Sequence, residues 1–277
     1  MFGRLSLVLA LILSGVIGVA LGLRPGPTRL IFFSVGQGDC TLFETEGTAI
    51  LIDAGPKTDA FDAGGRIVVP RLRSYGVAKI SLILLSHPDS DHIGGLAAIL
   101  RAHPGAQVGV SDQFRDHPDL LTTLREAGVQ PDRVIWFGRR ADAKIGRFSL
   151  EIRTPRWVEG EPDNDGSMFV RISDGKASAV FSGDASIPVE ARIAGETGWT
   201  AQVLHAGHHG SRTASGSAWL DQIQPKVAVV SCGRDNPYGH PHQSVLDALR
   251  ERGIEVLRTD EHRDLVFEAT DNGFRLR

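Results

Sequence analysis

The sequence predicts an α/β protein, and three observations support this fold class. Short apolar runs with the composition of β-strands are separated by glycine-containing turns along most of the chain. Runs of helical length and pattern lie between several of them. Histidine and aspartate side chains directly follow several strand-like runs, as functional groups do at one edge of a sheet. With 277 residues, the chain is long enough for such a fold to bury a sizeable core.

The composition is that of an ordinary globular protein, with 42% apolar and 23% charged residues. A net charge of −3 excludes a strongly basic protein that coats nucleic acid, although it leaves room for a local basic groove. Two cysteines, Cys40 and Cys232, are too few for a disulfide scaffold. Both lie in apolar runs, so we expect buried free thiols, with a single disulfide as the alternative in an exported protein.

Residues 1–27 are expected to be a signal peptide or membrane anchor ahead of one domain, residues 28–277. The run from Leu5 to Leu23 has 19 residues and no charge, which just spans a bilayer as a helix. Arg4 and the small residues near Ala20 also suit a secretory signal. A buried core helix is the remaining alternative. We therefore expect an N-terminal apolar helix and a domain outside the cytoplasm, periplasmic or extracellular.

The elements of the domain follow from periodicity and turn residues. Glycine turns between the first short strands predict an antiparallel or mixed sheet. Gly76, Gly128 and Gly253 stand where helices are expected to end, and Ser244 is the expected N-cap of the last helix. The predicted helices are 68–75, 96–100, 120–127, 219–223 and 244–252. The predicted strands are 29–35, 40–43, 49–53, 80–85, 134–137, 148–152, 168–172, 177–181, 202–204, 227–231, 255–258 and 265–268.

The stretch from Ser86 to Gly95 holds four side chains able to bind a metal within six residues. An apolar core has no use for ionised aspartates unless a cation neutralises them. Imidazole and carboxylate at this density suit Zn²⁺, Mn²⁺ or iron. The alternative is a solvated acidic turn at the start of a helix, which would need neither both histidines nor the glycine pair. The four side chains are His87, Asp89, Asp91 and His92.

Seven of the ten histidines fall into three clusters, and each cluster follows a strand-like run. Asp184 stands at a strand end in the same way. Groups far apart in the sequence but always at strand ends can converge on one edge of a sheet. A lone histidine is more often a surface or core residue, but three clusters with Asp184 predict a metal site built from several loops. The clusters are His87 with His92, His205 with His208 and His209, and His240 with His242.

These motifs carry a resemblance. Residues 87–95 resemble the H-x-[HD]-x-D-H signature of the metallo-β-lactamase fold. More narrowly, motifs from Leu30 to Leu249 are similar, in the same order, to the hydrolase-like DNase domain of the ComEC family of competence proteins, which are DNA-uptake channels. The matching segments are 35–39, 51–55, 69–76, 85–95, 164–167, 182–184, 208–211 and 236–241.

The resemblance implies a metallo-β-lactamase-like four-layer αβ/βα sandwich with a metal site at one edge between two sheets. It implies that one metal binds His87 and Asp89, that a second binds Asp91, His92 and His240, and that Asp184 bridges the two. The implied catalytic residues are Asp91, His208 and His209, the histidines acting as ligand or proton donor over the scissile group. The residues implied to orient ligands or substrate are Gln37, Asp39, Asp53, Asn164 and Ser211.

Two departures from the family pattern qualify these implications. Many relatives carry another histidine ligand where this chain has residues 163–165, Asp-Asn-Asp, which points to oxygen ligation or a missing first metal. The family's channel proteins have many membrane-spanning helices before this domain, whereas this chain has one apolar segment. Transport must therefore be done by another protein or not at all. A separate DNA-uptake channel protein is one expected partner, and the membrane is another, through residues 1–27.

The resemblance and the ligand set together predict a metal-dependent hydrolase, a DNase or phosphodiesterase with two divalent ions, Mn²⁺ or Zn²⁺, and a metal-activated water. Single-stranded DNA is the expected substrate, although no aromatic-rich platform for it is visible in the sequence. Arginines that flank the motifs either follow a phosphate backbone or are solvated surface. The alternatives are hydrolysis of a small or cell-envelope substrate (a phosphorylcholine ester or a lactam), or a metal-stabilised binding module without turnover.

Overall fold

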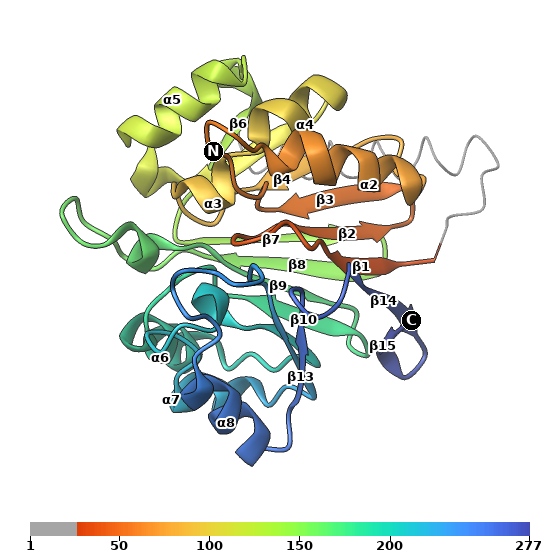
Figure 1. Cartoon of the computed structure of the whole chain (residues 1–277), viewed down its shortest axis with the longest axis vertical. Helices are drawn as coiled ribbons and strands as arrows, with labels where there is room; N and C mark the ends of the chain where they lie inside the picture. The colour runs from red at the N-terminus through yellow and green to blue at the C-terminus, as the bar shows by residue number, and fades with distance from the viewer. Residues whose placement is uncertain (1–26) are drawn as a thin grey trace.

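Two β-sheets lie face to face in the computed structural model, and helices cover their outer faces (Figure 1). The layers run helices, sheet, sheet, helices, which confirms the expected αβ/βα sandwich. The structure describes residues 27–277, so the predicted anchor or signal and its apolar helix lie outside the described residues. Within residues 27–277 no helix is both long enough and apolar enough to cross a bilayer.

The first sheet has eight strands in the order β15-β14-β1-β2-β3-β4-β5-β6. The strands from β3 to β6 are parallel, and the other neighbours are antiparallel. The mixed sheet expected from the glycine turns is therefore present. Its strands are β1 (Arg29–Phe32), β2 (Thr41–Thr45), β3 (Thr48–Ile52), β4 (Leu82–Leu84), β5 (Gln107–Ser111), β6 (Val134–Phe137), β14 (Leu265–Thr270) and β15 (Gly273–Leu276).

The second sheet has seven strands in the order β13-β12-β11-β10-β9-β8-β7. Here the strands from β10 to β13 are parallel, and those from β7 to β10 are antiparallel. Each half of the sandwich thus has a parallel portion whose loops emerge at one edge. The strands are β7 (Arg140–Ile145), β8 (Phe148–Arg153), β9 (Phe169–Ser173), β10 (Ser178–Phe181), β11 (Val203–His205), β12 (Val227–Val230) and β13 (Glu255–Arg258).

Helices of the first half pack on the first sheet, and α6, α7 and α8 pack on the second (Figure 1). The first group is η1 (Gly64–Val68), α2 (Val69–Ser74), α3 (Ser90–Ile93), α4 (Leu96–Ala102), η2 (Asp112–Phe114), α5 (Pro118–Glu126) and η3 (Pro131–Arg133). The second group is η4 (Asp163–Gly166), α6 (Ile187–Thr197), η5 (Gly207–Gly210), α7 (Ser217–Ile223) and α8 (Gln243–Glu251).

Both faces of each sheet are buried, and β1 shows how its residues divide between them. Leu30 and Phe32 face the second sheet and join the core between the sheets. Ile31 and Phe33 face the helices of the first half. This alternation follows from the two-residue period of a strand. A sheet covered on both faces explains why the strands appear in the sequence as continuous apolar runs.

Some elements differ from the sequence prediction. The strands β5, β7 and β15 and the helix α6 were not predicted. In β7 the residues alternate between exposed charged side chains and alanines, so the apolar signal of this edge strand is weak. The prediction of Ser244 as N-cap was wrong: His242 occupies that position with extended backbone, and α8 begins at Gln243. Pro241 and His242 thus already direct the chain into the helix.

The two cysteines are buried and free, as expected for an α/β core. Burial raises the pKa of the Cys40 thiol well above its usual value. Burial and the neighbouring Asp260 carboxylate raise the pKa of the Cys232 thiol to about 12. Both thiols are therefore protonated at neutral pH, and the reactive thiolate form is disfavoured.

Candidate metal centre

Histidine and aspartate side chains converge at the edge where strands of both sheets end. Asp53 follows β3, His87 follows β4, Asp184 follows β10, and η5 follows β11. Four overlapping groups of three residues place possible ligand atoms within 4.8 Å of one another. The groups are His87, His92 and Asp184; Asp91, His92 and His209; Asp39, Asp184 and His209; and Asp39, Asp53 and His92.

His87 and His92 are each fixed through Nδ1 by the protein. The Nδ1 atom of His92 lies 2.8 Å from Asp53 Oδ2, and a carboxylate can only accept, so Nδ1 carries the proton. Ser86 donates its hydroxyl proton to Asp53 and therefore accepts from His87 Nδ1 at 2.9 Å. In the neutral rings the lone pairs remain on Nε2. The two Nε2 atoms lie 3.5 Å from Asp89 Oδ2 and 3.3 Å from Asp184 Oδ1, respectively.

His208 and His209 follow the same rule. His209 donates from Nδ1 to the Ser231 carbonyl at 3.0 Å, and its Nε2 lies 3.1 Å from Asp91 Oδ2. The Nδ1 atom of His208 lies 3.0 Å from the Thr213 hydroxyl, and its Nε2 lies 3.7 Å from Asp184 Oδ2. Outer partners of this kind select the tautomer and orient the rings of metal-binding histidines. Four imidazoles thus direct Nε2 toward shared carboxylates.

Several buried atoms at this point have no hydrogen-bond partner. They include one oxygen of Asp184 and the Nε2 atoms of His87 and His92. Buried polar atoms are nearly always paired, and an unpaired one destabilises the fold. The atoms without partners are those that a divalent cation would bind. The donor set therefore fits a metal centre.

The charges in the cluster shift the pKa values strongly. Burial alone would oppose ionisation of Asp184, but the adjacent His92 and His209 outweigh it and hold the pKa of this carboxyl well below its usual value. Burial would likewise lower the pKa of both histidines, yet Asp184 and the neighbouring aspartates raise it well above the usual value. The cluster has a strong preference for positive charge next to Asp184.

The backbone brings the glycine turn after β1 directly against the central motif. The Asp39 N–H donates to the Asp91 carbonyl at 3.2 Å. Gly38 has φ +142°, and an added Cβ would lie 2.3 Å from that same carbonyl oxygen. Asp39 itself faces the outer nitrogens of the rings, 3.3 Å from His209 Nδ1 and 3.4 Å from His205 Nε2. It therefore balances the charge of the histidines from behind.

The loop that carries His208 and His209 has a strained backbone. Both residues have positive φ, 49° and 54°, which non-glycine residues rarely adopt. The His208 N–H donates to the Gly183 carbonyl at 3.1 Å, and this ties the loop to the Asp184 turn. At the far side of the loop the buried Glu190 accepts from the Gly216 N–H at 2.9 Å. These contacts hold the two rings in position.

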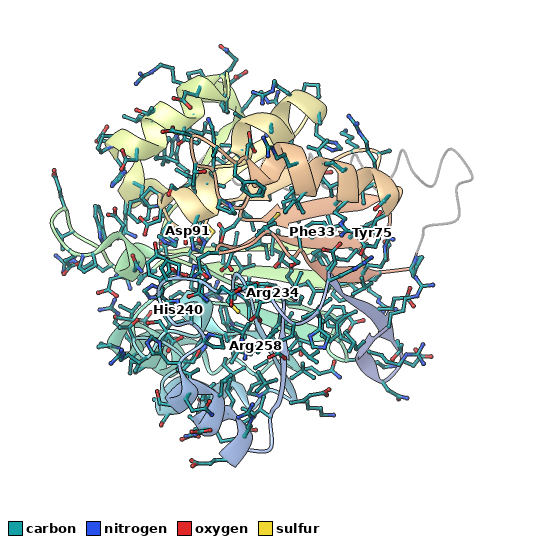
Figure 2. All side chains as sticks on the ribbon, viewed as in Figure 1. Phe33, Tyr75, Asp91, Arg234, His240 and Arg258 are labelled. Atoms are coloured by element: carbon teal, nitrogen blue, oxygen red, sulfur yellow. The ribbon has the colours of Figure 1, made fainter. Side chains whose placement is uncertain are left out.

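Three histidines and a tyrosine form a rim above the buried cluster. His240 lies 3.5 Å from the Gln37 amide nitrogen, and its ring centroid lies 5.7 Å from that of His208. Burial and the nearby His209 and His208 charges lower the pKa of His240 to about 4, so this ring is neutral at pH 7. We use the name rim for His208, Tyr238, His240 and His242. Figure 2 shows Asp91 in the upper half and His240 in the lower half of the same side.

The predicted site residues separate into two sets. The structure brings His87, Asp91, His92, Asp184 and His209 together with Asp39 and Asp53. It places Asp89, His208 and His240 in none of these groups among residues 27–277, and the groups contain only acidic and histidine side chains, so they do not bear on Gln37, Asn164 or Ser211. Of these, Asp89 and His208 still lie within 4 Å of cluster atoms, and Gln37 accepts from the Gly233 N–H at 3.1 Å. Ser211 accepts a hydrogen bond from the Thr213 hydroxyl, and that hydroxyl also contacts His208 Nδ1.

The Asp-Asn-Asp stretch, predicted as a substitute for a missing histidine ligand, has other partners. Asp163 lies 3.1 Å from His117 Nε2, and Asp165 accepts from the Ser186 N–H at 3.2 Å. Asn164 accepts from the Ser167 N–H through its carbonyl. The stretch is linked to Asp184 by Ser167, whose hydroxyl accepts a hydrogen bond from the Asp184 N–H.

Sequence reasoning missed several residues that orient the ligands. Ser86 links Asp53 to His87, and Ser231 holds His209 through its carbonyl oxygen. Ser86 directly precedes the histidine block at the end of β4, so its position in the sequence could have indicated a role in orienting His87. Ser231 acts through its backbone, which no side-chain motif reveals.

A family model described as Metallo-beta-lactamase superfamily matches residues 33–234. The chain belongs to the metallo-β-lactamase superfamily. This superfamily of metal-dependent hydrolases accounts for the sandwich fold and for the position of the cluster at the sheet edge.

Curated relatives support the narrower resemblance to competence proteins. The chain is 30% identical over 246 residues to ComE operon protein 3 of Bacillus subtilis, covering 82% of this chain and 31% of that protein. It is 32% identical over 245 residues to Competence protein ComA of Neisseria gonorrhoeae, covering 88% and 32%. Recombination protein 2 of Haemophilus influenzae is 33% identical over 225 residues, covering 81% and 27%. The chain thus spans about a third of the length of these relatives.

Solved structures confirm the fold at low sequence identity. CmlA, a diiron β-hydroxylase from Streptomyces venezuelae, superposes with a TM-score of 0.60 at 16% identity, covering 88% of this chain and 55% of that one. The metallo-β-lactamase fold protein YhfI from Bacillus subtilis has a TM-score of 0.56 at 16% identity, covering 87% and 99%. At this identity the likeness concerns the fold alone.

Proposed function

We propose that the domain is a metal-dependent nuclease or phosphodiesterase that cleaves DNA. The observation that carries this proposal is the set of imidazoles fixed through Nδ1, with Nε2 facing buried carboxylates. Carboxylates and imidazoles without cysteine favour Mn²⁺ or Zn²⁺. The names of the relatives, a competence protein and a recombination protein among them, favour DNA as the substrate.

The proposed ligand sets follow the distances in the cluster. His87, Asp89 and Asp184 would hold one ion, and Asp91, His92 and His209 would hold a second, with Asp184 available to both. His209 takes the position that the resemblance assigned to His240, because its Nε2 lies 3.1 Å from Asp91 Oδ2 and 3.6 Å from Asp184 Oδ2. When bound, two divalent ions would polarise a phosphoryl oxygen and lower the pKa of water.

The remaining residues are assigned by their place above the cluster. His208 is half-buried above the cluster, with Nε2 3.7 Å from Asp184 Oδ2, and burial lowers its pKa. Its imidazole is the group proposed to exchange a proton with the leaving oxygen. Gln37, fixed by the Gly233 N–H, and His240 would contact the substrate from the rim. Asp53 orients His92, and Asp39 balances the charge of the rings.

The proposed place of action is outside the cytoplasm, at the membrane and beside a separate DNA-uptake channel protein. Two observations support it: the uncharged run in residues 5–23, and a relative whose name refers to competence. Protease treatment of cells with intact and with opened outer layers would test it, because a cytoplasmic domain would survive both treatments.

The proposed activity is tested with the full chain, loaded with Mn²⁺ or Zn²⁺, on labelled single-stranded DNA. Asp91→Ala and Asp184→Ala are the matched controls, and metal content is measured for each protein. Metal-dependent cleavage by the wild type that both variants lose would establish the activity. A folded, metal-loaded wild type that leaves DNA intact would contradict it, and a phosphorylcholine ester would be the next substrate.

A further inference from the structure

A pocket of about 560 Å³ opens directly beside the candidate ligands Asp89 and Asp91. Most of its wall belongs to the first half of the domain, from α3, α4 and α5. Tyr238, in the loop between β12 and α8, is the contribution of the second half. The pocket therefore lies between the two halves, next to the metal centre, where a substrate bound at the metals would extend.

Tyr238 is unusual among the aromatic residues of the described part of the chain. It is 63% exposed, and within residues 27–277 it is the one aromatic side chain among the large apolar residues left exposed. Its ring stacks on His240 with centroids 5.7 Å apart and an interplanar angle of 24°. His240 is in turn held between His208 and His242. The rim thus supports one face of a large ring beside the metal centre.

The charges in the pocket disfavour negatively charged ligands. Asp119 and Glu126 face it with a single lysine, Lys57, whose ammonium group lies 3.4 Å from the Glu126 carboxylate. Such a surface disfavours phosphate inside the pocket itself, so the pocket fits a base better than the sugar-phosphate backbone of a strand. It suits an uncharged planar group with N–H donors, which the hydroxyls of Thr122 and Thr123 and the Asp119 carboxylate can accept.

We propose that Tyr238 stacks on the nucleobase next to the scissile phosphate, so that the enzyme recognises DNA with an unpaired, unstacked base. Single-strand-binding proteins use exposed aromatic rings in this way, because every base offers a π-face. In a duplex both faces of each base are covered by neighbouring pairs, so the ring has nothing to contact. The proposal rests on the proposed nuclease function and names its substrate class.

The experiment compares two single-stranded substrates of equal length, oligothymidylate and an oligomer of abasic sugar-phosphates. Both carry the same phosphates, but only the first carries bases. For oligothymidylate, Tyr238→Ala should raise KM about 10-fold to 100-fold with kcat nearly unchanged. Cleavage of the abasic oligomer should be the same in variant and wild type. Tyr238→Phe should behave as wild type, and Leu276→Ala, an exposed residue on the edge strand β15, is the control.

The outcomes are distinguishable. An equal loss on both substrates, or no preference of the wild type for oligothymidylate, would overturn base stacking while leaving the nuclease intact. A wild type that cuts neither oligomer would overturn the nuclease and the stacking proposal together. If that protein instead hydrolyses a phosphorylcholine ester and Tyr238→Ala loses it, the ring binds a cationic group. Equal metal content and melting temperature confirm that each variant is folded.

Discussion

Asp184 and Glu190 lie six residues apart, both are buried, and their surroundings move their pKa values in opposite directions. The Asp184 carboxyl faces His92 and His209, which hold its pKa well below the usual value despite burial. The donors that Glu190 faces in the described part of the chain are neutral: the backbone N–H groups of Gly216 and Ser215 and the hydroxyl of Ser182. Burial therefore raises the pKa of Glu190 to about 7.

The comparison shows what distinguishes a metal site from a structural acid in one core. A buried carboxylate stays ionised only when positive charge faces it, and otherwise it takes a proton. Asp184 lies among ionisable rings, and in the described part of the chain the Nε2 atoms of His87 and His92 have no hydrogen-bond partner, so a cation suits it. Glu190 accepts hydrogen bonds that fasten the loop carrying His208 and His209, and it needs no cation to do so.

The largest expected effect is the loss of the Asp184 charge. Asp184→Asn should lower the affinity for both ions by more than about 100-fold, beyond what the loss of an orienting partner costs. DNA cleavage should fall to background in the same protein. Isothermal titration with Mn²⁺ measures the affinity, and two ions bound with wild-type affinity would contradict the assignment.

His209 and His240 give a second, sharper comparison. His209→Ala should remove one of two bound ions, because its Nε2 lies 3.1 Å from Asp91. His240→Ala should keep both ions, since its ring interacts with Gln37 and the rim. Metal content after dialysis separates the two variants. The reverse result would return His240 to the ligand position that the sequence resemblance implied.

An intermediate effect is expected at Asp53, which orients His92 from behind. Asp53→Asn keeps the shape of the side chain but removes the negative charge that accepts the Nδ1 proton of His92. In the wild type, Nδ1 and Asp53 Oδ2 lie 2.8 Å apart. Metal affinity should fall about 10-fold to 100-fold, as for other outer partners of ligand histidines. Metal titration of the variant and the wild type measures this difference. An unchanged affinity would show that Asp53 orients Ser86 but not His92.

The smallest expected effect is a change in the pH dependence of the free energy of unfolding, caused by Glu190. A carboxyl whose folded pKa is raised binds its proton more tightly in the folded state, so stability falls as pH rises from the unfolded value toward about 7. Glu190→Gln imitates the neutral form and should remove this loss, up to about 3 kcal/mol between pH 5 and pH 8. Urea unfolding of both proteins at the two pH values measures the difference. Parallel pH dependence in the two proteins would show that Glu190 is not the titrating group.

Much of the centre could be predicted because its residues are concentrated at strand ends. The block from His87 to His92 needs only a short strand and a turn to bring its side chains together, so local sequence contains most of the information. Asp184 and the pair His208 and His209 likewise follow strands directly. The fold class followed from the same runs, because strands buried on both faces remain apolar throughout.

Other features could not be predicted because they depend on contacts between distant segments. The edge strand β7 joins the sheet through backbone hydrogen bonds to β8. Its polar and alanine side chains give no apolar pattern from which a strand could be predicted. The choice between His209 and His240 depends on which ring reaches Asp91, more than a hundred residues earlier in the chain.

The sequence by itself determined the fold family and the supply of imidazole and carboxylate groups, since both depend on residue type and on order along the chain. Only the tertiary structure decided which Nε2 atoms face which carboxylates, because one turn of the loop after β11 places His209 in the buried cluster and His208 on the rim. It also decided that Tyr238, one of two tyrosines, lies exposed in the wall of the pocket. Burial and charge at each position come from packing between segments, and these contacts give similar side chains different roles.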